Sequence, residues 1–440
     1  MSLRGPASRP MATSSAALLN FASQILVLGA GTATAVLVAR LLGPAGKGVV
    51  SLVMLSAALA VTFGALGVPM YHGCVAGRGD FSRAALRTNA VVYALAGSVL
   101  IGLTAVVARS MGILSVSAMQ LGWVLAAVPA GLAMRNFAGI FQGEGRFGEY
   151  NALTLVMWLV ILAGTLGLGL TVGGLEAVLA AWWAGYVVAA GLGWWMLRGG
   201  ALAPPNKALL RASLEFGLAV WCVQLVGEAN LRFDTYVAAF VGGAEGAGYY
   251  SVAVSISNLL FYLPAAIGTG TLPRMATETA EEAARLTGVG CRISLWSSAA
   301  LAVVVALLAR PLIRFLFGPA FDPAVVPLLL LLPGIVVYAL AHVTTSYFYG
   351  QAGRPMLNGL VALISLVVGL AASAILAPRY GLAGVATAVS IGRTVAMTVN
   401  LWLFTRLSRC PLIDALLPRP GDLAVMLAPL RRLWPEARPA

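Results

Sequence analysis

Residues 141–146 read FQGEGR, and residues 348–354 read FYGQAGR. Their opening Phe-x-Gly positions are 207 residues apart. The same offset relates further pairs, which are Asn151 and Asn358, and Gly174-Leu175 and Gly381-Leu382. A fixed offset that recurs along a chain indicates internal duplication. We therefore predict two copies of one structural unit, an arrangement that is common among secondary transporters of the membrane.

The composition excludes a water-soluble globule. Of the 440 residues, 60% are hydrophobic and only 10% are charged, whereas soluble domains carry roughly 25% charged residues. A helix needs about 20 apolar residues to cross a bilayer, and the apolar stretches number about twelve, six in each copy. We predict an all-α integral membrane protein, with about 12 transmembrane helices in two six-helix lobes related by internal duplication. An even number of spans gives both lobes the same orientation.

Pro204-Pro205, between basic residues, marks the boundary between the lobes. The apolar run 423–430 is too short for a further span, so we expect it on the membrane surface. The predicted segments are a cytoplasmic basic tail (1–12), the N-lobe with spans 1–6 (13–197), a cytoplasmic linker (198–212), the C-lobe with spans 7–12 (213–404) and a second cytoplasmic basic tail (405–440).

The formal charge is +13, and the basic residues behind it lie mostly on one side of the predicted topology. With a cytoplasmic N-terminus, the inside segments hold nineteen Lys or Arg residues and the outside loops hold six, a positive-inside bias that places both termini in the cytoplasm. The surplus is therefore a topology signal and an attraction to anionic lipid, with no nucleic-acid partner. We expect a multi-pass protein of the cell inner membrane. The outside residues are Arg40, Lys47, Arg109, Arg310, Arg314 and Arg379.

The sequence offers no catalytic or cofactor motif. His72 and His342 are far apart, the four cysteines share no close spacing, and no Walker-type phosphate loop is present. We expect no enzyme activity, no cofactor and no metal site. The longest inner loop, 274–292, has a helix-forming pattern with Glu282 and Arg285 at i,i+3, which predicts an ion pair on an amphipathic connector.

Two segments carry a family resemblance. Residues 37–48, LVARLLGPAGKG, and residues 234–253, which begin DTYVAAFVGG, resemble hallmark segments of the polysaccharide flippases in the multidrug/oligosaccharidyl-lipid/polysaccharide (MOP) superfamily. The duplicated Gly-x-Gly-Arg-like turns fit as well, and the likeness covers about residues 14–404. It implies a V-shaped, two-lobed exporter that turns a lipid-linked oligosaccharide across the membrane by alternating access. The related lipid II flippases usually carry two further spans.

Glycines mark the outer ends of two spans. Gly43-Pro44 and Gly242-Gly243 should stop a helix, with glycine supplying a positive φ. Gly46 and Gly246 then let the next helix start in a tight hairpin. We interpret these glycines as loop geometry rather than substrate contacts.

Ionisable residues at bilayer depth cost roughly 2.5–3.5 kcal/mol on insertion scales, so they mark cavities or pairs. Arg393 lies deepest, about 16 Å from either end of its span by the helix rise. Thr387, Ser390, Thr394 and Thr398 suggest a polar stripe beside it, which favours a water-filled cavity over a buried ion pair. The substrate-binding candidates are Arg393, Arg135, Arg232, Asp234, Glu228 and His342.

The other candidates keep alternative interpretations. Glu228 and Arg232, at i and i+4, form either a structural ion pair or part of a substrate site. Asp234 points away from Arg232 and is expected near the outer interface. Arg135 faces a cavity or extends to the inner surface, and His342 is a satisfied polar residue or a proton relay.

Arginines suit a diphosphate because the planar guanidinium donates hydrogen bonds in pairs. The sequence therefore predicts a flippase for polyprenyl-diphosphate oligosaccharide in cell-surface polysaccharide biosynthesis, with the arginines facing an inter-lobe cleft. Expected partners are membrane lipids, a polysaccharide polymerase and glycosyltransferases, with a proton or sodium ion for coupling. The alternative is a cation-coupled multidrug or small-molecule exporter of the same superfamily. It predicts an acidic N-lobe site, which spans 1–6 lack at mid-depth.

The topology is testable by reporter fusions. We expect fusions near residues 285 and 425 to report the cytoplasm and those near 245 and 380 to report the outside, because Lys and Arg are retained on the inner side. An external location of residue 285 would contradict the assignment of the lobes.

Overall fold

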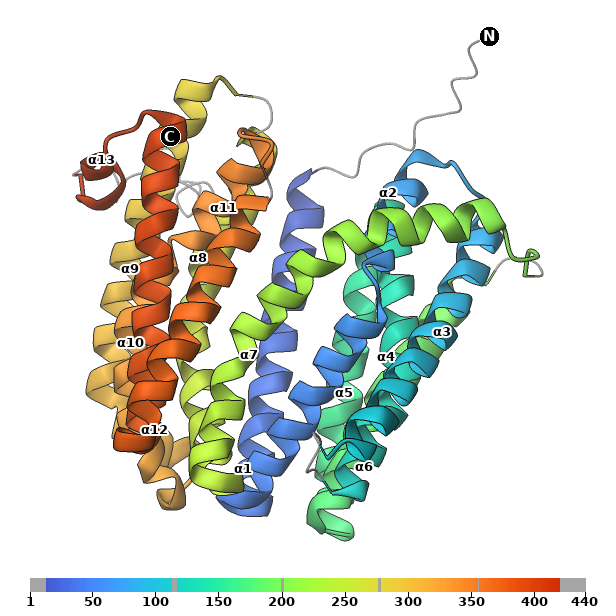
Figure 1. Cartoon of the computed structure of the whole chain (residues 1–440), viewed down its shortest axis with the longest axis horizontal. Coiled ribbons are helices and arrows are strands. Elements are labelled where there is room, and N and C mark those ends of the chain that lie inside the picture. Colours follow the sequence, from blue (N-terminus) through green and yellow to red (C-terminus); the bar gives the residue numbers. More distant parts are fainter. Residues whose placement is uncertain (1–12, 113–116, 199–201, 276–277, 355, 420–440) are drawn as a thin grey trace, which may run out of the picture. The chain divides into compact units, whose positions relative to one another are not determined.

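The computed structural model describes residues 13–112, 117–198, 202–275, 278–354 and 356–419, in which every regular element is a helix (Figure 1). Nine apolar helical stretches in these ranges are long enough to cross a membrane. Three of them contain a sharp reversal and therefore hold two crossings each, which gives the twelve predicted spans. The fold class is confirmed, whereas the apolar run 423–430 lies outside the described residues.

The first copy contains six helices, and the second copy, together with the chain that follows it, contains seven helices and two short 3₁₀ turns. The elements of the first copy are α1 (Thr13–Gly64), α2 (Val68–Arg78), α3 (Arg83–Ser110), α4 (Ala118–Gly143), α5 (Phe147–Thr171) and α6 (Gly174–Met196). Those that follow are α7 (Lys207–Ser257), η1 (Asn258–Phe261), α8 (Tyr262–Met275), α9 (Ala280–Leu316), η2 (Pro319–Ala324), α10 (Val325–Tyr338), α11 (Ala341–Gly350), α12 (Met356–Ser408) and α13 (Leu412–Leu416).

Single glycines reverse the three longest helices. Gly43 in α1 has φ 65° and ψ −171°, Gly243 in α7 has φ 62° and ψ −158°, and Gly381 in α12 has φ 58° and ψ −136°. This region of backbone space is essentially restricted to glycine. The predicted hairpins at Gly43 and Gly243 are confirmed by these backbone angles.

The chain divides into two compact units, residues 1–228 and 229–440. In the first, α5 packs on α6 and α1, and α4 packs on α2, α3 and α6. In the second, α10 packs on α12, α11 packs on α8, and α9 contacts α10 and α13. The predicted lobe boundary in the linker 198–212 stays a prediction, because this division falls within α7.

The repeated residues occupy matching places. Gly143 is the last residue of α4, and Gly350 is the last residue of α11. Gly174, which has φ 82°, is the first residue of α6, and its counterpart Gly381 reverses α12. The duplication seen in the sequence is therefore a duplication of structural positions.

The turn at residues 143–146 is held by ion pairs. Arg83 at the start of α3 donates to both carboxylate oxygens of Glu144, at 2.8 and 3.0 Å. Arg146 binds Glu144 at 3.1 Å and Glu149 at 3.0 Å. Burial opposes the charge of Arg146, but these two carboxylates raise the pKa of its guanidinium. The cluster joins the ends of α3, α4 and α5.

Two further findings concern the start of α9 and the short helix α13 that packs on it. The predicted pair is confirmed, since Arg285 Nε lies 3.2 Å from Glu282 Oε2. The connector itself is not separate, because α9 begins at Ala280 and continues as the ninth span. The sequence analysis also missed α13, which folds back onto α9 through a hydrogen bond of 3.0 Å from Trp296 Nε1 to the Leu416 carbonyl.

Replacing Gly243 tests the hairpin. Gly243→Ala should lower the free energy of unfolding by about 1–3 kcal/mol, because alanine cannot adopt this backbone conformation without strain. An added Cβ meets no atom within 4 Å at Gly243 or at Gly227 on the same helix. A steric clash therefore contributes nothing to the difference in stability between the two variants. Gly227→Ala, at an ordinary helical position, should be neutral or stabilising. Equal midpoints of thermal unfolding for the two purified variants would contradict this account.

Candidate substrate site around Arg393

Close packing fixes the backbone that carries Arg393. A Cβ added to Gly392 would lie 2.6 Å from the Ser365 carbonyl oxygen, so the second arm of α12 touches the first arm backbone to backbone. On α10, a Cβ at Gly334 would lie 2.5 Å from the Cα of Ser390. Ser390 Oγ donates to the Leu330 carbonyl at 2.5 Å. The segment 390–393 is therefore packed between the first arm of α12 and α10.

Arg393 is buried and lacks a full set of partners. It is 5% exposed, and no described residue accepts a hydrogen bond from its Nη1. Its guanidinium carbon lies 5.9 Å from the centre of the Phe261 ring, within the range of a cation–π interaction. An aromatic face stabilises the charge but accepts no strong hydrogen bond. The arginine is therefore held in place with donor capacity unused.

Asp234 provides the nearby negative charge. It is 1% exposed, so the expected exposure at the outer interface is wrong. The hairpin at Gly243 places Tyr250 opposite it, and the Tyr250 hydroxyl donates to Asp234 Oδ2 at 3.3 Å. The Thr235 amide donates to Oδ1 at 2.7 Å. Asp234 also interacts with Arg393 through its charge.

Aromatic residues complete this part of the second unit. The His342 ring lies 5.1 Å from Phe261, and the Tyr338 ring lies 6.3 Å from it, measured between centroids. Phe261 thus has arginine, histidine and tyrosine side chains around it. The Asn230 side chain lies within hydrogen-bonding reach of the Tyr338 hydroxyl. His342 is half-buried, and both interpretations of its role stay predictions.

The predicted polar stripe does not surround Arg393. Thr394 and Thr398 are exposed, and each hydroxyl donates to a carbonyl of its own helix, at 2.8 and 3.0 Å. The buried face of α12 instead carries Gly392, Arg393 and Asn400. Successive helix positions are 100° apart, so threonines at i+1 and i+5 point away from Arg393. The residue that shares its face is Asn400, at i+7.

The remaining candidates are one arginine in the first unit and two charged residues on α7. Arg135 on α4 is half-buried and donates from Nη1 to Thr62 Oγ1 on α1. Glu228 and Arg232 on α7 are also half-buried, and each takes part in interactions of its own. Whether Arg135, Glu228 and Arg232 contact substrate stays a prediction.

The sequence analysis missed a buried polar group in the first unit. Asn89 Nδ2 on α3 donates to Ser213 Oγ on α7 at 2.7 Å and lies 3.0 Å from His72 Nε2 on α2. Ser213 Oγ donates to the Leu209 carbonyl at 2.6 Å. These residues are far apart in sequence, so only the fold brings them together. They join the first arm of α7 to α2 and α3.

Metal binding has no support in the described part of the chain. There, no group of three or more His, Cys, Asp or Glu side chains is arranged to hold an ion. Asp234, the buried carboxylate of this site, has hydroxyl and amide partners instead.

These features define a multi-pass helical membrane protein built from two copies of a six-span unit. The model of the polysaccharide biosynthesis protein family matches residues 15–277, which is more than half of the chain. The chain therefore belongs to this family. No curated protein matches the sequence significantly.

Solved structures show the same fold. A multidrug resistance MATE family transporter of the MOP superfamily, in an inward-facing conformation, is 19% identical over 89% of this chain and 98% of its own, with a TM-score of 0.72. The lipid II flippase MurJ, in an inward closed conformation, is 14% identical over 97% of this chain and 94% of its own, with a TM-score of 0.71. A MOP superfamily transporter from Pyrococcus furiosus is 19% identical over 90% and 94%, with a TM-score of 0.61.

The Tyr250–Asp234 hydrogen bond provides a stability test. Tyr250→Phe should lower the free energy of unfolding by about 1–2 kcal/mol, because it removes a donor from a buried carboxylate. Tyr249→Phe is the matched control, since the Tyr249 ring packs against Phe321 at 6.1 Å and phenylalanine keeps that ring. Unfolding midpoints measured in detergent should separate the two variants. The same midpoint for Tyr250→Phe and wild type would contradict the role given to this bond.

Proposed function

We propose that this protein is a flippase that moves a polyprenyl-diphosphate-linked oligosaccharide across the inner membrane by alternating access, for the synthesis of a cell-surface polysaccharide. Arg393 holds the diphosphate in this proposal. The observation that carries it is a buried guanidinium whose Nη1 has no acceptor among the described residues. Membership of the polysaccharide biosynthesis family supports the substrate class.

The chemistry of the substrate matches the chemistry of the site. A diphosphate presents several anionic oxygens at the junction of lipid and glycan, and a guanidinium binds such oxygens in pairs. Asp234 limits how tightly Arg393 holds an anion, because its own charge acts on the same guanidinium. A transporter must release its substrate on the far side, so an attenuated site suits transport better than a fully cationic one.

The aromatic residues suit the sugar. The Phe261 ring lies beside the guanidinium and Tyr338 packs against that ring, and aromatic rings supply apolar contact area with little loss of side-chain entropy. In the proposal the glycan passes along these rings while the polyprenyl tail stays in lipid. The coupling ion, a proton or sodium, is not assigned to a residue.

A cation-coupled drug exporter is the competing function, since one structural neighbour is a multidrug transporter. That function predicts buried carboxylates in the first unit. Among the described residues of that unit, no Asp or Glu is buried, and Glu144 and Glu149 at its inner turn are paired with arginines. The acidic residue that is buried, Asp234, belongs to the second unit. These observations favour the anionic substrate.

Substitution of Arg393 tests the proposed function. Arg393→Ala should slow flipping of the lipid-linked oligosaccharide by about 10–100-fold, which corresponds to loss of charge-assisted hydrogen bonds to the diphosphate. Arg393→Lys should restore only part of the rate, because an ammonium keeps the charge but loses the planar fork. The measurement is the amount of lipid-linked oligosaccharide left on the cytoplasmic leaflet, at matched protein levels.

Arg379→Ala is the matched control, because Arg379 lies on the same helix but is exposed. Normal polysaccharide export by Arg393→Ala would exclude the diphosphate-binding role. Drug accumulation in cells that lack the protein, with normal polysaccharide, would favour the exporter instead.

A further inference from the structure

A second polar site lies at the end of the second unit where α9 begins and α12 ends. A cavity of about 740 Å³ is enclosed by the first turns of α9 and by the chain that follows α12. The cavity is separate from Arg393, which does not line it. By the charge bias of the sequence, this end of the unit faces the cytoplasm.

The lining is strongly cationic. Four arginines face the cavity, against one glutamate, Glu281. Arg285 has an ion pair to Glu282 at 3.2 Å, and Arg292 and Arg419 also take part in interactions within the protein. Guanidinium groups converging on one cavity suit a phosphate group, because each can donate two parallel hydrogen bonds to its oxygens. The four are Arg285, Arg292, Arg409 and Arg419.

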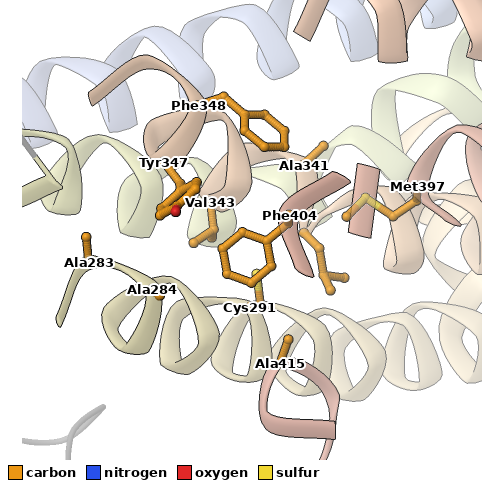
Figure 2. Close-up of a cluster of buried hydrophobic side chains, with 11 residues drawn as sticks. Ala283, Ala284, Cys291, Ala341, Val343, Tyr347, Phe348, Met397, Phe404 and Ala415 are labelled. Carbon is orange, nitrogen blue, oxygen red and sulfur yellow. The ribbon is translucent and has the colours of Figure 1, made fainter. Parts of the chain in front are cut away.

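The floor of the cavity is a packed apolar cluster. Tyr347 and Ala284 line the cavity and also belong to this cluster, in which the Tyr347 ring lies 5.1 Å from the Phe404 ring (Figure 2). Ala415 of α13 is fully buried in the same cluster. Figure 2 shows Ala415 on the far side of α9 from Tyr347. The cavity is therefore a built feature rather than a gap between surface side chains.

Exposed apolar residues follow the lining residues closely along the chain, since Trp296 lies one helical turn after Arg292 and Leu412 comes directly after Pro411. Trp296 on α9 and Trp402 on α12 are 50% and 52% exposed. On α13, Leu412 and Ile413 are also exposed, at 45% and 65%. Tryptophans of this kind gather at the headgroup level of membranes, and a short helix with exposed apolar residues lies in the same layer. The cationic cavity thus opens at the depth where phospholipid headgroups lie.

We propose that this cavity binds the phosphate headgroup of an anionic phospholipid from the cytoplasmic leaflet. The arginines bind the phosphate, and the exposed apolar residues near them in the chain contact the glycerol and the first part of the acyl chains. A soluble phosphate would use the arginines but not these apolar residues. The site would tie the end of α12, the helix that carries Arg393, to the composition of the membrane.

Lipid titration followed by native mass spectrometry of the purified full-length protein tests the proposal. Wild type should bind phosphatidylglycerol more tightly than phosphatidylcholine with the same acyl chains. The double variant Arg409→Gln/Arg419→Gln should bind phosphatidylglycerol about 30-fold more weakly, with binding of phosphatidylcholine unchanged. Both arginines are exposed, so the variant should fold normally.

Arg406→Gln is the matched control. Arg406 lies near the same end of α12, stacks on Trp402 at 5.0 Å and does not line the cavity, so this variant should bind lipid like wild type. Equal binding of phosphatidylglycerol by the double variant and wild type would overturn the proposal. Displacement of the lipid by an equal concentration of inorganic phosphate would assign the site to a soluble anion and overturn it as well. Displacement by a tenfold lower concentration of polyprenyl diphosphate would assign it to the transported substrate instead.

Discussion

The structure depends on reversing a helix at the membrane surface without a connecting loop. Inside a bilayer every backbone polar group needs an internal partner, so the chain crosses as helices and turns only at the surface. Gly43, Gly243 and Gly381 make three of these turns with one residue each, in a backbone region closed to other residues. The two arms then lie close enough for the contacts that build the site. Tyr250 reaches Asp234 because one such turn stands between them.

The two copies keep their geometry and differ in their chemistry. Arg135 and His342 are 207 residues apart, as the repeated motifs are, and each lies eight residues before the glycine that ends its helix, Gly143 in α4 and Gly350 in α11. One donates to a threonine, and the other packs on an aromatic ring. Tyr186 is the counterpart of Arg393 by the same offset, and its ring packs edge-to-face against the Trp182 ring, with the centroids 5.1 Å apart. The deep charge therefore belongs to the second copy alone at this position, which fits a duplicated scaffold whose halves have taken different tasks.

Local and periodic signals in the sequence predicted the fold well. Apolar length gave the spans, glycines gave the hairpins, and the i,i+3 spacing gave the ion pair of Glu282 and Arg285, because each of these depends on neighbouring residues. The candidate site was predicted only in part. Arg393 was predicted from its depth in the twelfth span. Its partners Phe261 and Tyr338 come from other helices, and no local pattern predicts them. The i+7 spacing of Asn400, and the similar distances from Gly243 to Asp234 and Tyr250, nine and seven residues, were signals that periodic reasoning could have used.

The energetics of Arg393 explain why a buried charge can serve transport. A guanidinium at bilayer depth costs several kcal/mol unless protein groups stabilise it. Phe261 and Asp234 supply part of that stabilisation, one through the ring face and one through its charge. If a carboxylate occupied all the donors, an incoming anion would have to displace it and would gain little. If no negative charge were nearby, a bound anion would leave slowly. The site of this protein lies between these limits. Tyr250 and Thr235 anchor the Asp234 carboxylate, whose charge acts on Arg393, while Nη1 of Arg393 has no described acceptor. Binding followed by release requires such an intermediate strength.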